Sequence, residues 1–207
     1  MAVASLTSPE DIINAALAKI GYRRRVGSIW EGSDASKVAL DVYAQTRDDI
    51  MRTNDWGFAR RDATLTLQKS APPGGYAVTP WNPNVNPAPP YSYQYAYPSD
   101  SLRIRAIRNA DPFLVNYDPR DHLFTVANDE TFTPAQKVVL TDVGPVAIAT
   151  YSAQITDPAQ MDADFVEVLI DAMGKRLGAA LEKLDASRMA EQDELRATAE
   201  ADTTQAG

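Results

Sequence analysis

The chain has 207 residues, of which 44% are hydrophobic and 23% charged, with a formal net charge of −8 and no cysteine. This length predicts one domain or two small ones and a core that needs no covalent staples. The absence of cysteine excludes disulfide scaffolds, thiolate zinc sites, iron–sulfur clusters and cysteine nucleophiles. No apolar run approaches the roughly 20 residues of a membrane-spanning helix, and residues 1–7 lack the pattern of a signal peptide. The acidic balance argues against a protein that wraps nucleic acid.

Helical periodicity marks both ends of the chain. The first predicted helix begins at Ser8, a good N-cap, and ends at Gly21. A second helix is predicted over residues 35–53, where apolar side chains recur on one helical face. Near the C-terminus a long apolar stripe predicts a helix over 165–181, followed after a break by a polar helix over 188–201. Because helices lie at both ends, we expect them to pack on each other.

The centre of the chain changes to the period of two that is typical of half-buried strands. The Pro-rich loop 71–90 holds seven of the fourteen prolines, which forbid a regular helix or a central strand there. Four tyrosines follow in the run 91–97, at alternate positions that place them on one face. Turn-forming residues separate the predicted strands, which favours an antiparallel meander. These strands are residues 63–68, 102–107, 113–117, 123–126, 138–140 and 146–151.

Together the patterns predict an α+β fold, in which a terminal α-helical bundle carries an inserted antiparallel β domain. The helical bundle domain is assigned to residues 1–60 and 157–201. The inserted β domain, with its long Pro-rich loop 71–90, is assigned to residues 61–156. Residues 202–207 are expected to form a flexible tail.

Residues that could support catalysis are scarce. His122 is the one histidine, and a surface position at a strand end explains it better than a role as general base or metal ligand. Neither a phosphate-binding glycine loop nor a G-x-S-x-G nucleophile motif is present. Carboxylates such as Asp48 and Asp49 fall on exposed helix faces or in first turns, where the helix dipole favours them. We therefore expect no catalytic residue, no metal, no cofactor and no enzymatic activity.

Arginines cluster at 23–25, 60–61 and 103–108 although the chain is acidic. Arginine suits bidentate pairing with carboxylates, and two interpretations compete: contacts to nucleic acid, or salt bridges to neighbouring subunits. Subunit contacts are favoured, since no nucleic-acid-binding motif accompanies the arginines. The tyrosines fit a buried strand face and a contact strip equally well. The candidate interface residues are Arg60, Arg61, Tyr93, Tyr95, Arg103, Arg105 and Arg188, and the candidate anchors of the helix-to-sheet junction are Trp56 and Phe58.

Several motifs occur in an order that is shared with a known family. They are ALAKIG at 16–21, YAQTRDDIMR at 43–52, DWGFARR at 55–61, YAYPSDSLRI at 95–104, and the junction formed by 150–158 and 164–167. In this order and spacing the chain resembles the podophage tail tubular protein A family of head-to-tail adaptors. The first two segments are similar to the family's opening helices, the third to the exit that follows them, and the last two to a strand entry and the β-to-helix junction.

The resemblance implies a structural virion protein of the phage neck and tail, which resides in the host cytoplasm during assembly. Members of the family form a homo-oligomeric ring, commonly of twelve subunits. The ring joins the portal protein to the tail nozzle or tail completion proteins, and double-stranded DNA passes through it without sequence-specific binding. The candidate arginines would then contact neighbouring subunits or the portal. No membrane partner is expected.

The acidity of the chain is localised, since residues 157–202 hold twelve acidic and five basic side chains. An acidic lumen would repel DNA phosphates and allow passage. The alternative function is a cytoplasmic peptide- or protein-binding module that uses the aromatic strip 91–97. A hydrolase that uses dispersed carboxylates ranks last.

Overall fold

The computed structural model describes residues 8–23, 25–28, 30–109 and 123–205. The chain divides into two compact units: a helical unit, Met1–Ile50 with Ile155–Gly207, and a β unit, Met51–Gln154. His122 and the predicted strand 113–117 lie outside the described residues. Within the described ranges, no helix is long and apolar enough to cross a membrane.

The helical unit contains α1 (Pro9–Lys19), most of α2 (Asp34–Thr53), the short η2 (Pro158–Gln160) and α3 (Ala163–Gln205). The start of α1 agrees with the sequence, because Ser8 Oγ accepts a hydrogen bond from the Asp11 backbone N–H at 3.1 Å. α1 packs along α3, where Gly174 lies beside the backbone of Ala16 and the side chain of Ile20.

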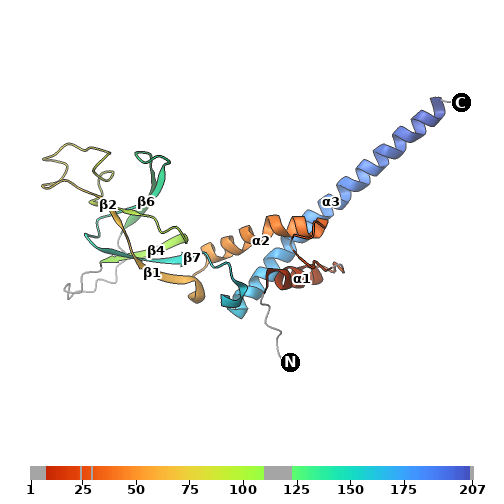
Figure 1. The fold of residues 1–207 in the computed structure, drawn as a ribbon, viewed down its shortest axis with the longest axis horizontal. Helices are drawn as coiled ribbons and strands as arrows, with labels where there is room; N and C mark the ends of the chain where they lie inside the picture. The colour runs from red at the N-terminus through yellow and green to blue at the C-terminus, as the bar shows by residue number, and fades with distance from the viewer. Residues whose placement is uncertain (1–7, 24, 29, 110–122, 206–207) are drawn as a thin grey trace. The chain divides into compact units, whose positions relative to one another are not determined.

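The expected terminal helical bundle is wrong. Among the described residues, extensive helix packing is confined to α1 and α3, while α2 is joined to α3 by Arg176, which donates to Thr46 at 2.9 Å and Asp49 at 3.1 Å. The buried side chains described for α3 end at Leu181. Strands, rather than a bundle, dominate the fold (Figure 1).

The break expected at 185–187 is also absent, and α3 continues as a single helix of 43 residues (Figure 1). No proline interrupts it. Ser187, whose hydroxyl competes with backbone bonds in other settings, donates to the Lys183 carbonyl one turn earlier at 2.9 Å. The helix absorbs this residue without ending there.

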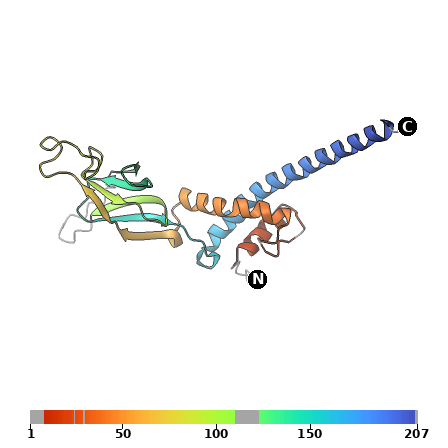
Figure 2. The same ribbon diagram turned by 45° about the horizontal axis from the view of Figure 1, so that its top comes forward.

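The β unit contains η1 (Gly57–Ala59) and, in its described residues, two antiparallel sheets. Sheet A has the strand order β1–β7–β4 and sheet B the order β2–β3–β6–β5, and Figure 2 shows them as two layers. The strands are β1 (Arg60–Thr64), β2 (Leu67–Ser70), β3 (Tyr93–Ala96), β4 (Ser101–Asn109), β5 (Phe124–Asp129), β6 (Gln136–Thr141) and β7 (Ala147–Ala153).

The predicted strand 63–68 is divided between two sheets. The Leu65 N–H donates to the Ala147 carbonyl of β7 at 2.8 Å, whereas the Thr66 carbonyl accepts from the Ala96 N–H of β3 at 2.9 Å. The chain therefore leaves sheet A and enters sheet B between these two residues. The buried core side chains of the two sheets include Ile104, Ile107 and Tyr151 from sheet A and Tyr95 and Val139 from sheet B.

The Pro-rich loop 71–90 is folded by its own polar contacts. The side-chain amide of Asn86 donates to the Ser70 carbonyl at 3.0 Å. The Pro87 carbonyl accepts from both the Tyr76 hydroxyl at 2.8 Å and the Trp81 indole N–H at 2.9 Å. Asn86 and Pro87 are buried, so the loop is held against sheet B at its edge strand β2.

Candidate functional site

One face of sheet A gathers most of the arginines that the sequence singles out. The register pairs both Arg60 of β1 and Arg103 of β4 with Ser152 of the central strand β7. Directly paired residues of antiparallel strands project to the same side, so these three side chains form a row across the sheet. The arginine face that contains this row comprises Arg60, Asp62, Arg103, Arg105, Arg108, Thr150 and Ser152.

Arg105 is already engaged within the chain. Its Nε donates to Ser152 Oγ at 2.9 Å, and its Nη2 donates to the carbonyls of Met51 at 3.2 Å, Arg52 at 3.3 Å and Asn54. The carbonyls in the last turn of a helix have no partner inside it, so Arg105 caps the C-terminal end of α2. Burial lowers the pKa of Arg105.

Arg108 is likewise engaged, through Asp62. Its Nη2 lies 2.9 Å from Asp62 Oδ2, and Asp62 Oδ1 accepts from the Thr150 hydroxyl at 2.5 Å. The hydrogen bond from Thr150 lowers the pKa of Asp62 against the opposing effect of burial, and the charges of Arg108 and Arg60 lower it further. The ionised carboxylate neutralises one of the guanidinium groups on this face.

Arg60 and Arg103 differ from Arg105 and Arg108. Both side chains are exposed, and neither forms a hydrogen bond or an ion pair with the part of the chain that the structure describes. Neighbouring strands lie about 4.8 Å apart, so the two Cα atoms are separated by about 10 Å across Ser152. Two guanidinium groups without a direct partner in the described residues have the charge and geometry to bind anionic groups, carboxylate or phosphate.

The remaining charged and anchor candidates lie off this face. Arg61 projects to the opposite side of sheet A from Arg60 and pairs with Asp100 at 3.0 Å. Arg188 lies in α3, and its side chain is outside the described part of that helix. Trp56 precedes η1 and Phe58 lies within it, between α2 and β1; both are half-buried, with ring centroids 6.3 Å apart.

The tyrosines of 91–97 do not share one environment. Tyr95 is fully buried, and its hydroxyl donates to the Val143 carbonyl at 2.9 Å. Tyr93 is half-buried beside it, with ring centroids 6.3 Å apart. The Tyr97 ring is covered by the ammonium group of Lys137, 4.0 Å from the ring centroid. Much of this strip is thus engaged inside the β unit.

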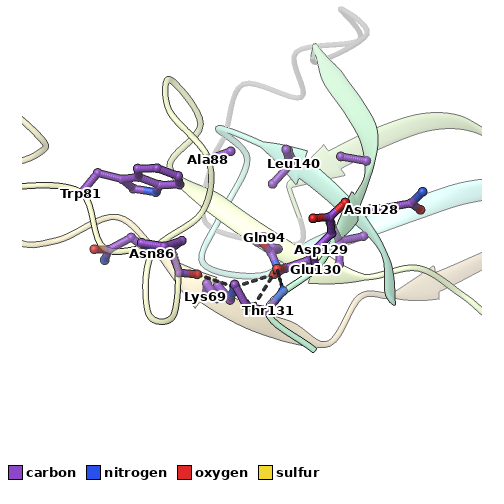
Figure 3. A pocket seen from close by; sticks show the side chains of 13 residues that line it. Lys69, Trp81, Asn86, Ala88, Gln94, Asn128, Asp129, Glu130, Thr131 and Leu140 are labelled. Atoms are coloured by element: carbon purple, nitrogen blue, oxygen red, sulfur yellow. Dashed lines mark hydrogen bonds and ion pairs between the residues drawn. The ribbon is translucent and has the colours of Figure 1, made fainter. Parts of the chain in front are cut away.

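A pocket of about 370 Å³ opens between the Pro-rich loop and the β5–β6 hairpin (Figure 3). Trp81 lines it from the loop, and Asn128 and Glu130 line it from the hairpin. At its base lies a buried ion pair, with Lys69 Nζ 2.5 Å from Asp129 Oδ2 and the two side chains only 6% and 10% exposed.

The hydrogen-bonding capacity of this ion pair is used within the chain. Lys69 Nζ also donates to the Pro83 carbonyl at 2.7 Å and Thr131 Oγ1 at 2.8 Å. Asp129 accepts from Gln94 Nε2 at 2.6 Å and from the Thr131 backbone N–H and hydroxyl at 2.9 and 2.7 Å. Burial opposes ionisation of Asp129, but these hydrogen bonds outweigh it and hold its pKa well below the usual range. The pair therefore joins loop, sheet and hairpin rather than offering a charge to a ligand.

Sequence reasoning missed this pair, because its partners are sixty positions apart and nothing local marks either as buried. Within the described ranges, no group of three or more His, Asp or Glu side chains could hold a metal ion. The arginine face is therefore the candidate functional site, on charge and geometry. No protein-family model matches the chain, and no curated protein matches its sequence.

Proposed function

We propose that this chain is a structural head-to-tail adaptor of a phage virion, assembling as a ring between the portal and the tail. The observation that carries the proposal is the division of charge between the two units. The helical unit holds nineteen acidic and eleven basic residues, whereas the β unit holds nine of each. The whole net charge of −8 thus belongs to the helical unit, while the neutral β unit concentrates arginines on one sheet face.

Such a subunit is suited to head-to-tail association. A basic surface on one unit and an acidic surface on the other are different patches, so copies associate through heterologous contacts, which close into a ring when the rotation allows. The acidic unit also suits a channel for double-stranded DNA, because its field repels phosphates and so discourages tight binding. The resemblance to tail tubular protein A supplies the expected number of about twelve subunits.

The long helix α3 supports a contact with a further protein. At 1.5 Å per residue its 43 residues extend about 65 Å. Its described buried side chains run only from Phe165 to Leu181. Helices draw most of their stability in water from tertiary packing, and the polar sequence 188–205 would gain such packing from a partner. We assign that role to the portal.

The test is assembly of the purified chain with the portal of the same phage, measured by native mass spectrometry and negative-stain microscopy. We expect a ring of about twelve copies bound to the portal, whose assembly weakens as salt screens the charged contacts. A chain that stays monomeric with the portal present, and that is absent from purified virions, would overturn the proposal.

Deletion of residues 188–207 tests the role assigned to the end of α3. We expect the shortened chain to keep its fold, because the side chains of α3 that are described as buried all precede residue 188, and to bind the portal at least ten-fold more weakly. Circular dichroism serves as the folding control. Unchanged affinity for the portal would contradict this assignment, and so would a truncated chain that fails to fold.

A further inference from the structure

The arginine face leaves two guanidinium groups, those of Arg60 and Arg103, without a hydrogen bond or an ion pair in the described part of the chain. Arg105 is held by the α2 carbonyls and Arg108 by Asp62, so these two side chains are fixed in place. Arg60 and Arg103 flank Ser152 on the same face and are exposed. Arg60 and Arg103 lie on β1 and β4, which are separated by β7. A partner for this row must therefore offer two anionic groups that lie about 10 Å apart or less.

The helical unit offers such a pair in the first turns of α3. Asp164 and Glu167 are both exposed, and neither has an ion-pair partner in the described ranges. At positions i and i+3 they lie on one helix face with Cβ atoms about 5–6 Å apart. Val168 beside them is 43% exposed and adds an apolar contact. Two other carboxylates of this unit are occupied, since Asp171 pairs with Lys19 and Asp49 with Arg176.

We infer that Arg60 and Arg103 of one copy bind Asp164 and Glu167 of α3 in a second copy of this chain. The inference rests on the proposed function, because it names the contact through which the ring closes. A second copy fits better than DNA, since the chain carries a net charge of −8 and DNA binding requires an excess of basic groups. The contact is heterologous, as ring closure requires.

The first experiment uses the absence of cysteine from the chain. Two single-cysteine chains, Arg103→Cys and Glu167→Cys, are mixed under mild oxidation, so that any bond between them is intermolecular. We expect a disulfide-linked heterodimer at least ten-fold more abundant than in a mixture of Glu167→Cys with Ser99→Cys, an exposed control position of the β unit. Equal yields in the two mixtures would overturn the inference, whether or not rings are present.

The second experiment reverses the charges. Arg60→Glu/Arg103→Glu and Asp164→Arg/Glu167→Arg are each expected to raise the concentration needed for assembly at least ten-fold. A chain that carries all four substitutions should assemble again, because every contact is then reversed on both sides. Lys175→Glu/Lys183→Glu is the matched control for Arg60→Glu/Arg103→Glu, since it makes the same change in net charge at exposed positions of α3. This control should assemble like the unaltered chain.

The outcomes separate this contact from the proposed function. If the unaltered chain forms rings and Arg60→Glu/Arg103→Glu forms them equally well, the contact is wrong and the adaptor proposal stands. If both double variants fail and the combined chain also fails, Asp164 and Glu167 are not the partners. If the unaltered chain never assembles, with or without portal, the adaptor proposal fails, and the cysteine experiment still decides the contact. Loss of DNA binding, without an effect on assembly, would assign the row to phosphate instead.

Discussion

The buried ion pair of the β unit provides the sharpest test of the structural reasoning. Asp129→Asn keeps the shape of the side chain but replaces one acceptor oxygen by an amino group. In the native structure each carboxylate oxygen accepts two hydrogen bonds: Oδ2 from Lys69 and Gln94, and Oδ1 from the backbone N–H and the hydroxyl of Thr131. The amino group would therefore face donors, and the Lys69 ammonium group, 6% exposed, would lose its counter-charge.

The expected cost follows from this uncompensated charge. Removing one partner of a buried pair typically costs about 3–5 kcal/mol, whereas replacing both partners is often close to neutral. We expect Asp129→Asn to reduce the free energy of unfolding by about 3 kcal/mol or more. The double variant Lys69→Met/Asp129→Asn should lose at least about 1 kcal/mol less than the sum of its single variants, because the two residues are in contact.

Tryptophan fluorescence can restrict the measurement to the β unit. The chain has three tryptophans, and in a Trp30→Phe background the remaining Trp56 and Trp81 both belong to that unit. Urea unfolding of the full-length variants then gives the stability of the β unit. A loss below about 1 kcal/mol for Asp129→Asn, or additive single variants, would refute the claim that this pair joins loop, sheet and hairpin.

The same pair predicts how stability depends on pH. The pKa of Asp129 is lower in the folded state than in the unfolded state, so its contribution is present above the ordinary carboxyl pKa of about 3.9 and is lost as the pH falls below that value. We expect the stability of the unaltered chain to decline below about pH 4. The Asp129→Asn chain, already weaker, should show a smaller decline.

Four further substitutions test local features of the structure. Gly144→Ala should destabilise the β unit by about 1–3 kcal/mol, because the new Cβ would lie 2.5 Å from Tyr93 Cε2. Gly57→Ala is the control, because a Cβ at that position meets no atom within 4 Å. It should change the free energy of unfolding by less than about 0.5 kcal/mol in the same urea assay. Burial raises the pKa of Tyr95 to about 12, so the stability it provides is lost as the pH rises from 10 to 12, and Tyr95→Phe should flatten that alkaline decline. Tyr43 is buried, and its hydroxyl has no hydrogen-bond partner in the described structure. Tyr43→Phe should therefore raise the free energy of unfolding by up to about 1 kcal/mol in a thermal unfolding assay. A clear loss of stability would show that the hydroxyl does have a partner.

Local signals in the sequence led to correct local structure. Ser8 was expected to cap the first helix, and it does so through the Asp11 N–H, because a cap depends on residues a few positions apart. The helical bundle was wrong for the opposite reason. Periodicity shows that a helix has an apolar face but does not show what covers that face, and α1 and α3 satisfy one another without a full bundle.

The candidate site depends on long-range pairing that no local pattern contains. Arg60 and Arg103 were named from the sequence, but their common pairing with Ser152 arises only once β7 lies between β1 and β4. Arg105, which belongs to the same sequence cluster, instead donates hydrogen bonds to the carbonyls at the end of α2. The run 63–68 shows the same limitation, because an alternating pattern cannot indicate that the chain changes sheets at Leu65 and Thr66.

The acidic surplus and the exposed arginines lie in different units of the chain. A net charge of −8 spread evenly would mainly make copies of the chain repel one another. Confined to the helical unit, with the β unit neutral, it leaves the exposed Arg60 and Arg103 as groups that a second copy can neutralise. Arg105 and Arg108 are already held in place on the same face, so of its four arginines only Arg60 and Arg103 would lose side-chain entropy when the contact forms. In the proposed ring, electrostatic attraction between unlike units, rather than a large apolar interface, would set the direction in which subunits add.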